Sequence, residues 1–143
     1  MQIRASRPDD VERCIKIWCS SVDATHDFLT PEDRIAIEAQ VRSFLPEAPL
    51  WLAVSDDDNP LGFMLVNEAH IEALFVHADM RGKGVGTELL NHARLLRPEL
   101  TVDVNEQNAG ARSFYRSYGF VETGRRGTDD EGRPYPIISM RLG

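Results

Sequence analysis

The sequence has little cysteine and no long apolar run. Its two cysteines, Cys14 and Cys19, lie in a helical pattern that turns them to different sides, so we expect reduced thiols rather than a disulfide. No stretch approaches the roughly 20 apolar residues that cross a bilayer. The polar residues after Met1 do not resemble a secretory signal. The sequence therefore predicts a cytoplasmic protein without membrane contact.

Metal-binding patterns and a basic excess are also missing. The histidines show neither HExxH nor paired CxxC spacing, so we expect no metal site. The formal net charge is -7, from 23 acidic and 16 basic side chains. Because nonspecific nucleic-acid binding relies on a basic surface, this charge argues against a nucleic-acid partner. It suits a positively charged acceptor, such as an amine.

The composition is that of an ordinary globular protein, with 42% hydrophobic and 27% charged residues. The length of 143 residues favours one domain, spanning residues 1–143. Apolar periodicity, proline and glycine predict helices over 8–22, 30–45, 89–96 and 108–118, and strands over 3–5, 50–54, 61–66, 71–76, 100–104, 120–123 and 135–142. This order indicates a mixed α/β or α+β sheet, in which 71–76 and 100–104 run parallel.

A glycine-rich loop lies between the strand 71–76 and the following helix. Glycine lets the main chain turn sharply and approach a ligand closely. The helix N-terminus offers unpaired N–H groups, and two cations add positive charge, so the loop is suited to phosphate groups. The loop residues are Arg81, Gly82, Lys83, Gly84, Val85, Gly86 and Thr87.

Three explanations of the loop compete with a plain glycine-rich turn. A Walker A loop requires GxxxxGK followed by Ser or Thr, and this string is absent. A dinucleotide fingerprint requires GxGxxG, whereas the spacing here is GxGxG. The pattern RxxGxG is satisfied by Arg81, Gly84 and Gly86.

A second motif decides between these explanations. Residues 105–120 read NxxNxxAxxFYxxxGF. Together with the loop, and with the strand 100–104 between them, this segment resembles the GNAT superfamily of N-acetyltransferases. Within that superfamily, residues 21–29, 41–51 and 132–136 resemble the small bacterial YjaB-type proteins. The resemblance covers the chain but leaves the acceptor open.

The resemblance implies a fold and a donor. We expect a central, mostly antiparallel sheet of about six to seven strands, with a parallel pair splayed at the cofactor site and about four flanking helices. The donor is acetyl-CoA, bound as an acyl-donor substrate, with no metal. Its pyrophosphate is expected on the loop from Arg81 to Thr87. Its pantetheine arm is expected beside Leu74, Phe75 and Val76, where a bulge frees a main-chain N–H for the oxyanion.

The same resemblance assigns roles in catalysis. Tyr115 matches the family's proton donor to the departing sulfur, unless it is only a packed aromatic. Asn108 is expected to bind the cofactor arm, and this is compatible with capping a helix. The general base is left open between Glu72, Asp103 and the pair His26 with Asp27. We also expect His26, Asp27 and Asp103 to contact the acceptor. Each of these four residues is equally compatible with a merely solvated side chain.

The sequence thus predicts an N-acetyltransferase that moves an acetyl group to a primary amine, on a small molecule or a protein, by direct attack in a ternary complex. A catalytically idle acetyl-CoA sensor is the alternative from another class, which Tyr115 weakens. An aminoacyl-tRNA-acetylating, toxin-like GNAT is disfavoured by the net charge. The oligomeric state is left open between monomer and homodimer.

Overall fold

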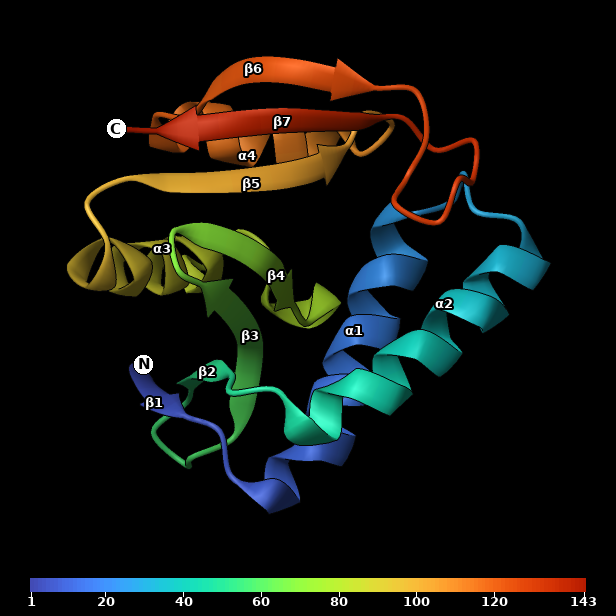
Figure 1. The fold of residues 1–143 in the computed structure, drawn as a ribbon. Coiled ribbons are helices and arrows are strands. Elements are labelled where there is room, and N and C mark those ends of the chain that lie inside the picture. Colours follow the sequence, from blue (N-terminus) through green and yellow to red (C-terminus); the bar gives the residue numbers. More distant parts are fainter. The chain divides into compact units, whose positions relative to one another are not determined.

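The computed structural model describes residues 1–143 and contains seven strands and four α-helices (Figure 1). The helices are α1 (Val11–Thr25), α2 (Pro31–Phe44), α3 (Val85–Leu96) and α4 (Ala109–Tyr118), with short 3-10 turns at Pro8–Asp10 (η1), Leu45–Glu47 (η2) and Ala78–Met80 (η3). The strands are β1 (Gln2–Ala5), β2 (Trp51–Val54), β3 (Pro60–Asn67), β4 (His70–Val76), β5 (Leu100–Asn105), β6 (Val121–Arg126) and β7 (Ile137–Leu142).

The strands form one sheet in the order β1-β2-β3-β4-β5-β7-β6. Its antiparallel pairs include β1 with β2, β2 with β3, β5 with β7 and β6 with β7. The pair β4 and β5 is parallel, with His70 opposite Thr101 and Ile71 opposite Val102. The mixed, mostly antiparallel sheet and its parallel pair are therefore confirmed.

The contacts divide the chain into two compact units, each built from two separate segments. The first unit holds residues 1–65 and 73–92, and the second holds residues 66–72 and 93–143. The chain passes between the units within β3, β4 and α3. The expectation of a single domain stays a prediction.

The first unit has an apolar core between its helices and its strands. In it α1 and α2 lie side by side (Figure 1). The apolar face of α1 supplies Cys14, Ile17 and Trp18, which are almost fully buried. They share one cluster with Leu52 of β2 and Phe63 of β3. Burial of side chains of this size contributes about 1.5–3 kcal/mol each to folding, so the core anchors the strands that lead to the loop at residue 81.

In the second unit β5, β7 and β6 lie side by side, and α4 packs along one face of these strands (Figure 1). The strand β5 alternates buried and exposed residues, with Leu100, Val102 and Val104 buried. Gly119 ends α4 with a φ of +126°, which glycine adopts without strain. Its N–H donates to the carbonyl of Tyr115, so the predicted glycine stop is confirmed.

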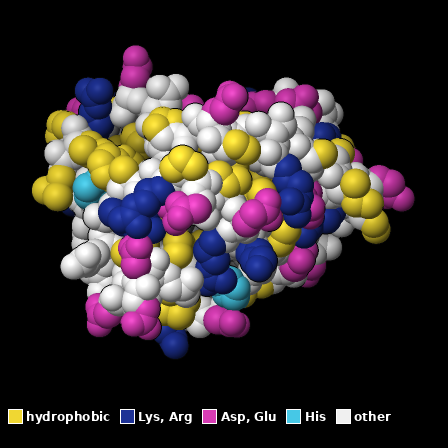
Figure 2. Space-filling model, turned by 90° about the horizontal axis from the view of Figure 1, so that it is seen from below, with side chains coloured by type: hydrophobic (Ala, Val, Ile, Leu, Met, Phe, Trp, Pro, Cys, Tyr) yellow, Lys and Arg dark blue, Asp and Glu magenta, His cyan; other side chains and the backbone are white.

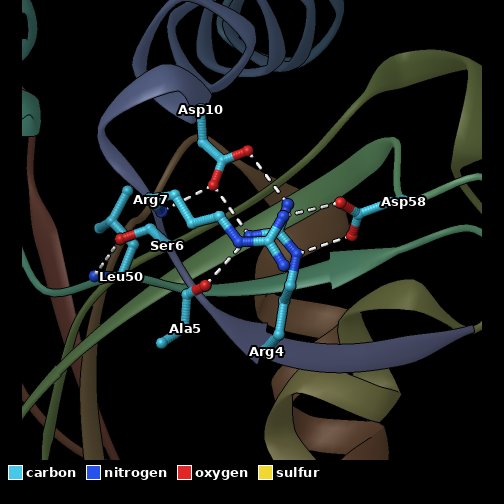
Figure 3. Close-up of polar contacts among 7 residues, drawn as sticks. All are labelled: Arg4, Ala5, Ser6, Arg7, Asp10, Leu50 and Asp58. Atoms are coloured by element: carbon cyan, nitrogen blue, oxygen red, sulfur yellow. Dashed lines mark hydrogen bonds and ion pairs between the residues drawn. The ribbon is translucent and has the colours of Figure 1, made fainter.

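An ion-pair cluster fastens the N-terminal segment of the first unit (Figure 3). Arg4 of β1 donates through two nitrogens to the carboxylate of Asp10, at 2.9 and 3.1 Å. Its Nε donates to Asp58, in the turn between β2 and β3, at 2.8 Å. Arg7 donates to the other oxygen of Asp58. Arg4 therefore links β1 and η1 to the turn between β2 and β3, which is more than 45 residues away in the sequence.

Some element bounds differ from those predicted. The strand β6 runs to Arg126 rather than residue 123, because Arg125 and Arg126 pair with Ile138 and Ile137 of β7. The helix α3 begins at Val85, four residues before the predicted start. Glycine is a poor helix former, and the apolar spacing indicates only the later part of α3.

The two cysteines are free, with Cys14 buried and Cys19 half-buried. The Cys19 thiol lies 3.5 Å from an oxygen of Glu38. Histidine, cysteine and acidic side chains form no cluster of three that could hold a metal ion. Among the helices, none combines the length and the apolar character that a membrane span requires.

Candidate functional site

Two glycines shape the loop between η3 and α3 in the first unit. Gly82 has a φ of +75° and Gly84 a φ of +84°, which side-chain-bearing residues rarely adopt. A Cβ at either position would meet nothing within 4 Å, so both glycines border open space. Gly86, in contrast, already lies in the first turn of α3. The loop therefore needs its glycines for main-chain conformation, and its outer side is free for a ligand.

The loop presents donors and positive charge to that open side. The first bond of the α3 ladder runs from the N–H of Glu88 to the carbonyl of Gly84 at 3.0 Å. The N–H groups of Val85, Gly86 and Thr87 thus have no partner inside the helix. Arg81 and Lys83 are exposed and form no ion pair. An anion at this place would meet free N–H groups, two cations and the positive end of α3.

The start of α3 is seated on a glycine of the neighbouring strand. Val85, whose side chain is 1% exposed, is the only buried residue of the loop from Arg81 to Thr87. A Cβ at Gly62 of β3 would lie 2.9 Å from a methyl carbon of Val85 and 2.9 Å from the carbonyl oxygen of Phe75. Val85 therefore fixes the start of α3 against β3, and Gly62 has no room for a side chain.

A second support of the loop was not predicted from the sequence. The hydroxyl of Ser20 on α1 accepts a hydrogen bond from the N–H of Ala78 at 3.0 Å. The N–H of His77 donates to the carbonyl of Leu61 on β3, and its Nδ1 accepts from the N–H of Asp79. These contacts hold η3, the turn that leads into Arg81. Because Ser20 and Ala78 are 58 residues apart, no local pattern could have indicated their contact.

The three strand residues expected beside the cofactor arm differ in orientation. Phe75 packs on Phe63, with ring centroids 5.6 Å apart, and belongs to the edge of the core of the first unit. Leu74 and Val76 are half-buried. The Phe75 side chain is thus committed to the core, and its main chain is what a ligand could meet. The bulge expected in this strand stays a prediction.

Tyr115 lies in α4 of the second unit, between two aromatic rings. Its ring is 5% exposed and packs edge-on against Phe114 and Phe120, at centroid distances of 5.1 and 5.3 Å. Burial raises the pKa of Tyr115 above its ordinary value, so its hydroxyl is protonated at neutral pH, as a proton donor must be. The hydroxyl has no hydrogen-bond partner, yet it is not among the atoms sealed from solvent. Packing and a donor role are therefore both compatible with its position.

Asn108 caps the helix that carries Tyr115. Its Oδ1 accepts a hydrogen bond from the N–H of Ala111 at 3.0 Å. This satisfies one of the free N–H groups at the start of α4. The amide nitrogen of the same side chain remains available as a donor. The capping role is therefore confirmed, and the cofactor role stays a prediction.

Two candidate bases, Glu72 and Asp103, lie in the second unit and differ in their contacts. The side chain of Glu72 on β4 is exposed and makes no hydrogen bond or ion pair. Asp103 on β5 accepts a hydrogen bond from the Ser139 hydroxyl at 2.9 Å and lies 3.5 Å from Arg126. Because its oxygens already contact side chains of β7 and β6, Asp103 is better explained as structural.

The third candidate base, His26, follows α1 in the first unit. Its Nδ1 lies 2.7 Å from the hydroxyl oxygen of Thr25, and its ring lies 5.2 Å from that of Phe28. Burial lowers the pKa of His26, so the imidazole is neutral at pH 7. Asp27 beside it is exposed. A neutral imidazole has a free nitrogen lone pair and can accept a proton.

Residues 25–141 match the protein family described as "Acetyltransferase (GNAT) domain". They include both the glycine loop and the segment around Tyr115. The chain belongs to the GNAT acetyltransferase family. It is therefore an acyltransferase, and the acetyl-transfer activity predicted from the two motifs agrees with this assignment.

Particular GNAT relatives are similar over nearly the whole chain. The peptidyl-lysine N-acetyltransferase YjaB of Escherichia coli is 54% identical over 140 residues, which are 98% of this chain and 95% of that protein. The protein of the same name from Salmonella typhimurium is 51% identical, over 98% of this chain and 97% of that protein. The solution structure of apo-form YjaB from Escherichia coli superposes with a TM-score of 0.95, over 98% of this chain and 95% of that one.

A more distant N-acetyltransferase structure shows the same fold with a ligand. The PaiA N-acetyltransferase of Thermoplasma acidophilum, solved in complex with coenzyme A, has a TM-score of 0.72 over 97% of this chain and 98% of that one. Its identity is 21%, so the likeness concerns the fold alone. The predicted GNAT-like fold is therefore confirmed.

Proposed function

We propose that this GNAT enzyme transfers the acetyl group of acetyl-CoA to the ε-amine of lysine residues in proteins. The observation that carries the proposal is the similarity over nearly the whole chain to two relatives named peptidyl-lysine N-acetyltransferase, at 54% and 51% identity. A small-molecule amine is the second acceptor class that the sequence left open. The acidic net charge of -7 suits either cationic acceptor.

For the donor, we assign the pyrophosphate of acetyl-CoA to the loop from Arg81 to Thr87. The support is the combination of positive-φ glycines, free N–H groups and unpaired cations at that loop. The pantetheine arm would pair with the main chain of β4 around Leu74 and Val76, because the Phe75 side chain is committed to the core. The free amide nitrogen of Asn108 would donate to the same arm.

For the chemistry, Tyr115 is the proton donor and a main-chain N–H of β4 stabilises the oxyanion. The lysine amine attacks the thioester carbon, a C–N bond forms, the C–S bond breaks, and the sulfur receives a proton. The support for Tyr115 is its protonated state and its unpaired hydroxyl. For the base, His26 is favoured over Glu72, because its neutral imidazole has the basicity that the step requires.

The alternative is a GNAT protein that binds acetyl-CoA without turning it over. Such a sensor would need the loop but not an unpaired phenol at position 115, so the structure favours catalysis. We further propose that the enzyme works in the cytoplasm without a nucleic-acid or membrane partner, as a monomer or a homodimer. The net charge supports the lack of a nucleic-acid partner, and the absence of a long apolar segment supports the lack of a membrane partner.

The test uses peptides that each contain one lysine and a blocked N-terminus, together with a matched peptide in which that lysine is arginine. We expect release of free thiol and gain of one acetyl group only with the lysine peptides. A panel of polyamines and amino sugars runs beside them under the same conditions. Turnover of a small amine with none of any lysine peptide would contradict the proposed acceptor, and turnover of neither would favour the sensor.

A further inference from the structure

The basic side chains of this chain are almost all arginines. Of its 16 basic residues, 14 are arginines, and the two lysines are Lys16 and Lys83. Lysine is ordinarily one of the commonest residues. An arginine keeps its charge and is not an acetyl acceptor, whereas a lysine amine is. A protein built this way offers very few sites to its own proposed activity.

The arginines and the lysines also differ in their partners. On the face drawn in Figure 2, basic side chains lie among acidic ones. Arginines in both units form ion pairs with carboxylates, for example Arg34 with Asp23 and Arg125 with Glu106. Neither lysine forms an ion pair, and both side chains are exposed. Both amines are therefore accessible and able to attack an acetyl donor.

One of these two lysines stands where acetylation has a consequence. Lys83 lies between the two positive-φ glycines of the loop, with open space on both sides. Its charge is one of the two unpaired cations that the proposed function assigns to the pyrophosphate. Lys16 lies on the exposed side of α1 and is not among the residues assigned to catalysis or binding. Acetylation of Lys83 would remove a positive charge from the loop, whereas acetylation of Lys16 would remove one only from the surface of α1.

We propose that Lys83 is a self-acetylation site, modified by a second copy of this enzyme, and that its acetylation weakens acetyl-CoA binding. The inference rests on the proposed lysine acetyltransferase activity. The Lys83 amine of one copy attacks the thioester held by another, an amide bond forms, and CoA leaves with its thiol protonated while one proton goes to solvent. Reaction within one copy is excluded, because the loop holds the pyrophosphate and the thioester lies a pantetheine arm away.

This arrangement gives the reaction a characteristic dependence on acetyl-CoA. The donor copy must be loaded, whereas the acceptor copy must be empty, since bound pyrophosphate covers Lys83. The rate is therefore highest when half of the copies are loaded, and it falls again at saturation. Direct chemical acetylation by free acetyl-CoA would rise to a plateau instead, because it needs only an empty acceptor.

The experiment incubates the purified full chain with acetyl-CoA over a range of concentrations and follows Lys83 and Lys16 by mass spectrometry. We expect a maximum near half-saturation and a rate per molecule that increases with protein concentration. A lysine peptide is assayed in the same samples, so that loss of the proposed function is detected separately. Acetylated peptide with unmodified Lys83 would overturn this inference alone, and a plateau that does not depend on protein concentration would overturn the transfer between copies.

The effect on binding is tested with variants of both lysines. Lys83→Gln is uncharged, as acetyl-lysine is. Its affinity for CoA should fall by roughly tenfold or more, because a charged hydrogen-bond donor is lost. Lys83→Arg should lose less, since it keeps the charge. Lys16→Gln is the matched control and should bind CoA as the wild type does. Equal CoA affinity of Lys83→Gln and wild type would overturn the regulatory part.

Discussion

The hydroxyl of Thr25 fixes the tautomer of His26. Thr25 Oγ1 donates its proton to the carbonyl of Ser21 at 2.7 Å, and it lies 2.7 Å from His26 Nδ1. Since the hydroxyl proton is already committed, Nδ1 must be the donor in the second contact. The neutral ring is therefore protonated at Nδ1, which leaves Nε2 with a free lone pair. A ring held in this state is ready to accept a proton.

The first prediction concerns His26 as the base. His26→Asn keeps a short polar side chain but removes Nε2, so kcat should fall by about 100-fold while CoA affinity is unchanged. Thr25→Val removes the hydroxyl that fixes the tautomer of His26, and it should cause a smaller loss of kcat. Steady-state kinetics on a lysine peptide that the wild type acetylates, together with a CoA titration, checks both. A His26→Asn enzyme with the wild-type kcat would return the role of base to Glu72.

The pH dependence of the wild type follows from the same residue. Burial lowers the pKa of His26, so the charged form is disfavoured and the base is available at neutral pH. As the pH falls through this lowered pKa, the ring gains a proton and activity is lost. We expect kcat to decline on the acid side with an apparent pKa below the ordinary value of 6.5. A decline centred above that value would argue against His26.

Tyr115→Phe tests the proton donor. The ring keeps its packing on Phe114 and Phe120, and the hydroxyl has no partner to lose, so the free energy of unfolding should not change. We expect kcat to fall by about 100-fold or less, because a CoA thiolate is a tolerable leaving group. CoA affinity should stay the same. Tyr118→Phe in the same helix is the control, and equal kcat in wild type and Tyr115→Phe would make Tyr115 a packed aromatic only.

Gly84→Val tests the loop. The φ of +84° is strained for valine, and the new side chain would project into the open space assigned to the pyrophosphate. CoA binding by calorimetry should weaken by roughly tenfold or more, whereas the fold persists. Gly132→Val is the matched control, because Gly132 also has a positive φ, of +79°, and open space around its Cβ position but lies outside the loop. Unchanged CoA binding by Gly84→Val would show that the loop is only a turn.

Asp10→Ala tests the N-terminal cluster of Figure 3. Asp10 is 8% exposed and accepts two hydrogen bonds from Arg4. Its removal should lower the free energy of unfolding by roughly 1–3 kcal/mol in urea titration. Asp56→Ala is the control, because the Asp56 side chain is 99% exposed and its removal should change stability little. Equal stability of the two variants would contradict a structural role for the Arg4–Asp10 pair.

Acid should weaken the stabilisation that the Arg4–Asp10 pair gives to the folded chain. Hydrogen bonds from Arg4 hold the pKa of Asp10 below its ordinary value of 3.8. A lowered pKa in the folded state contributes stability above the unfolded-state value, and this stability is lost as the pH falls through the folded-state pKa. Below about pH 4, the wild type should therefore lose stability more steeply than Asp10→Asn.

The sequence predicted the parts of the site that depend on local chemistry. The positive-φ glycines of the loop, the Asn108 cap and the Gly119 stop follow from residue types at fixed spacings. The seat of Val85 on Gly62 and the contact of Ser20 with Ala78 could not be predicted, because they join distant segments through packing. The extension of β6 to Arg126 likewise depends on its partner β7 rather than on its own charged residues.

The two cysteines bear on how turnover of this enzyme is measured. Burial raises the pKa of the Cys14 thiol to about 12 and also raises that of Cys19. Thiolates are the reactive form in disulfide exchange, so at neutral pH the folded chain reacts slowly with disulfide reagents and with oxidised CoA. A colorimetric reading of released thiol should therefore count CoA molecules with little background from the protein, and a slow rise without acetyl-CoA would report unfolding.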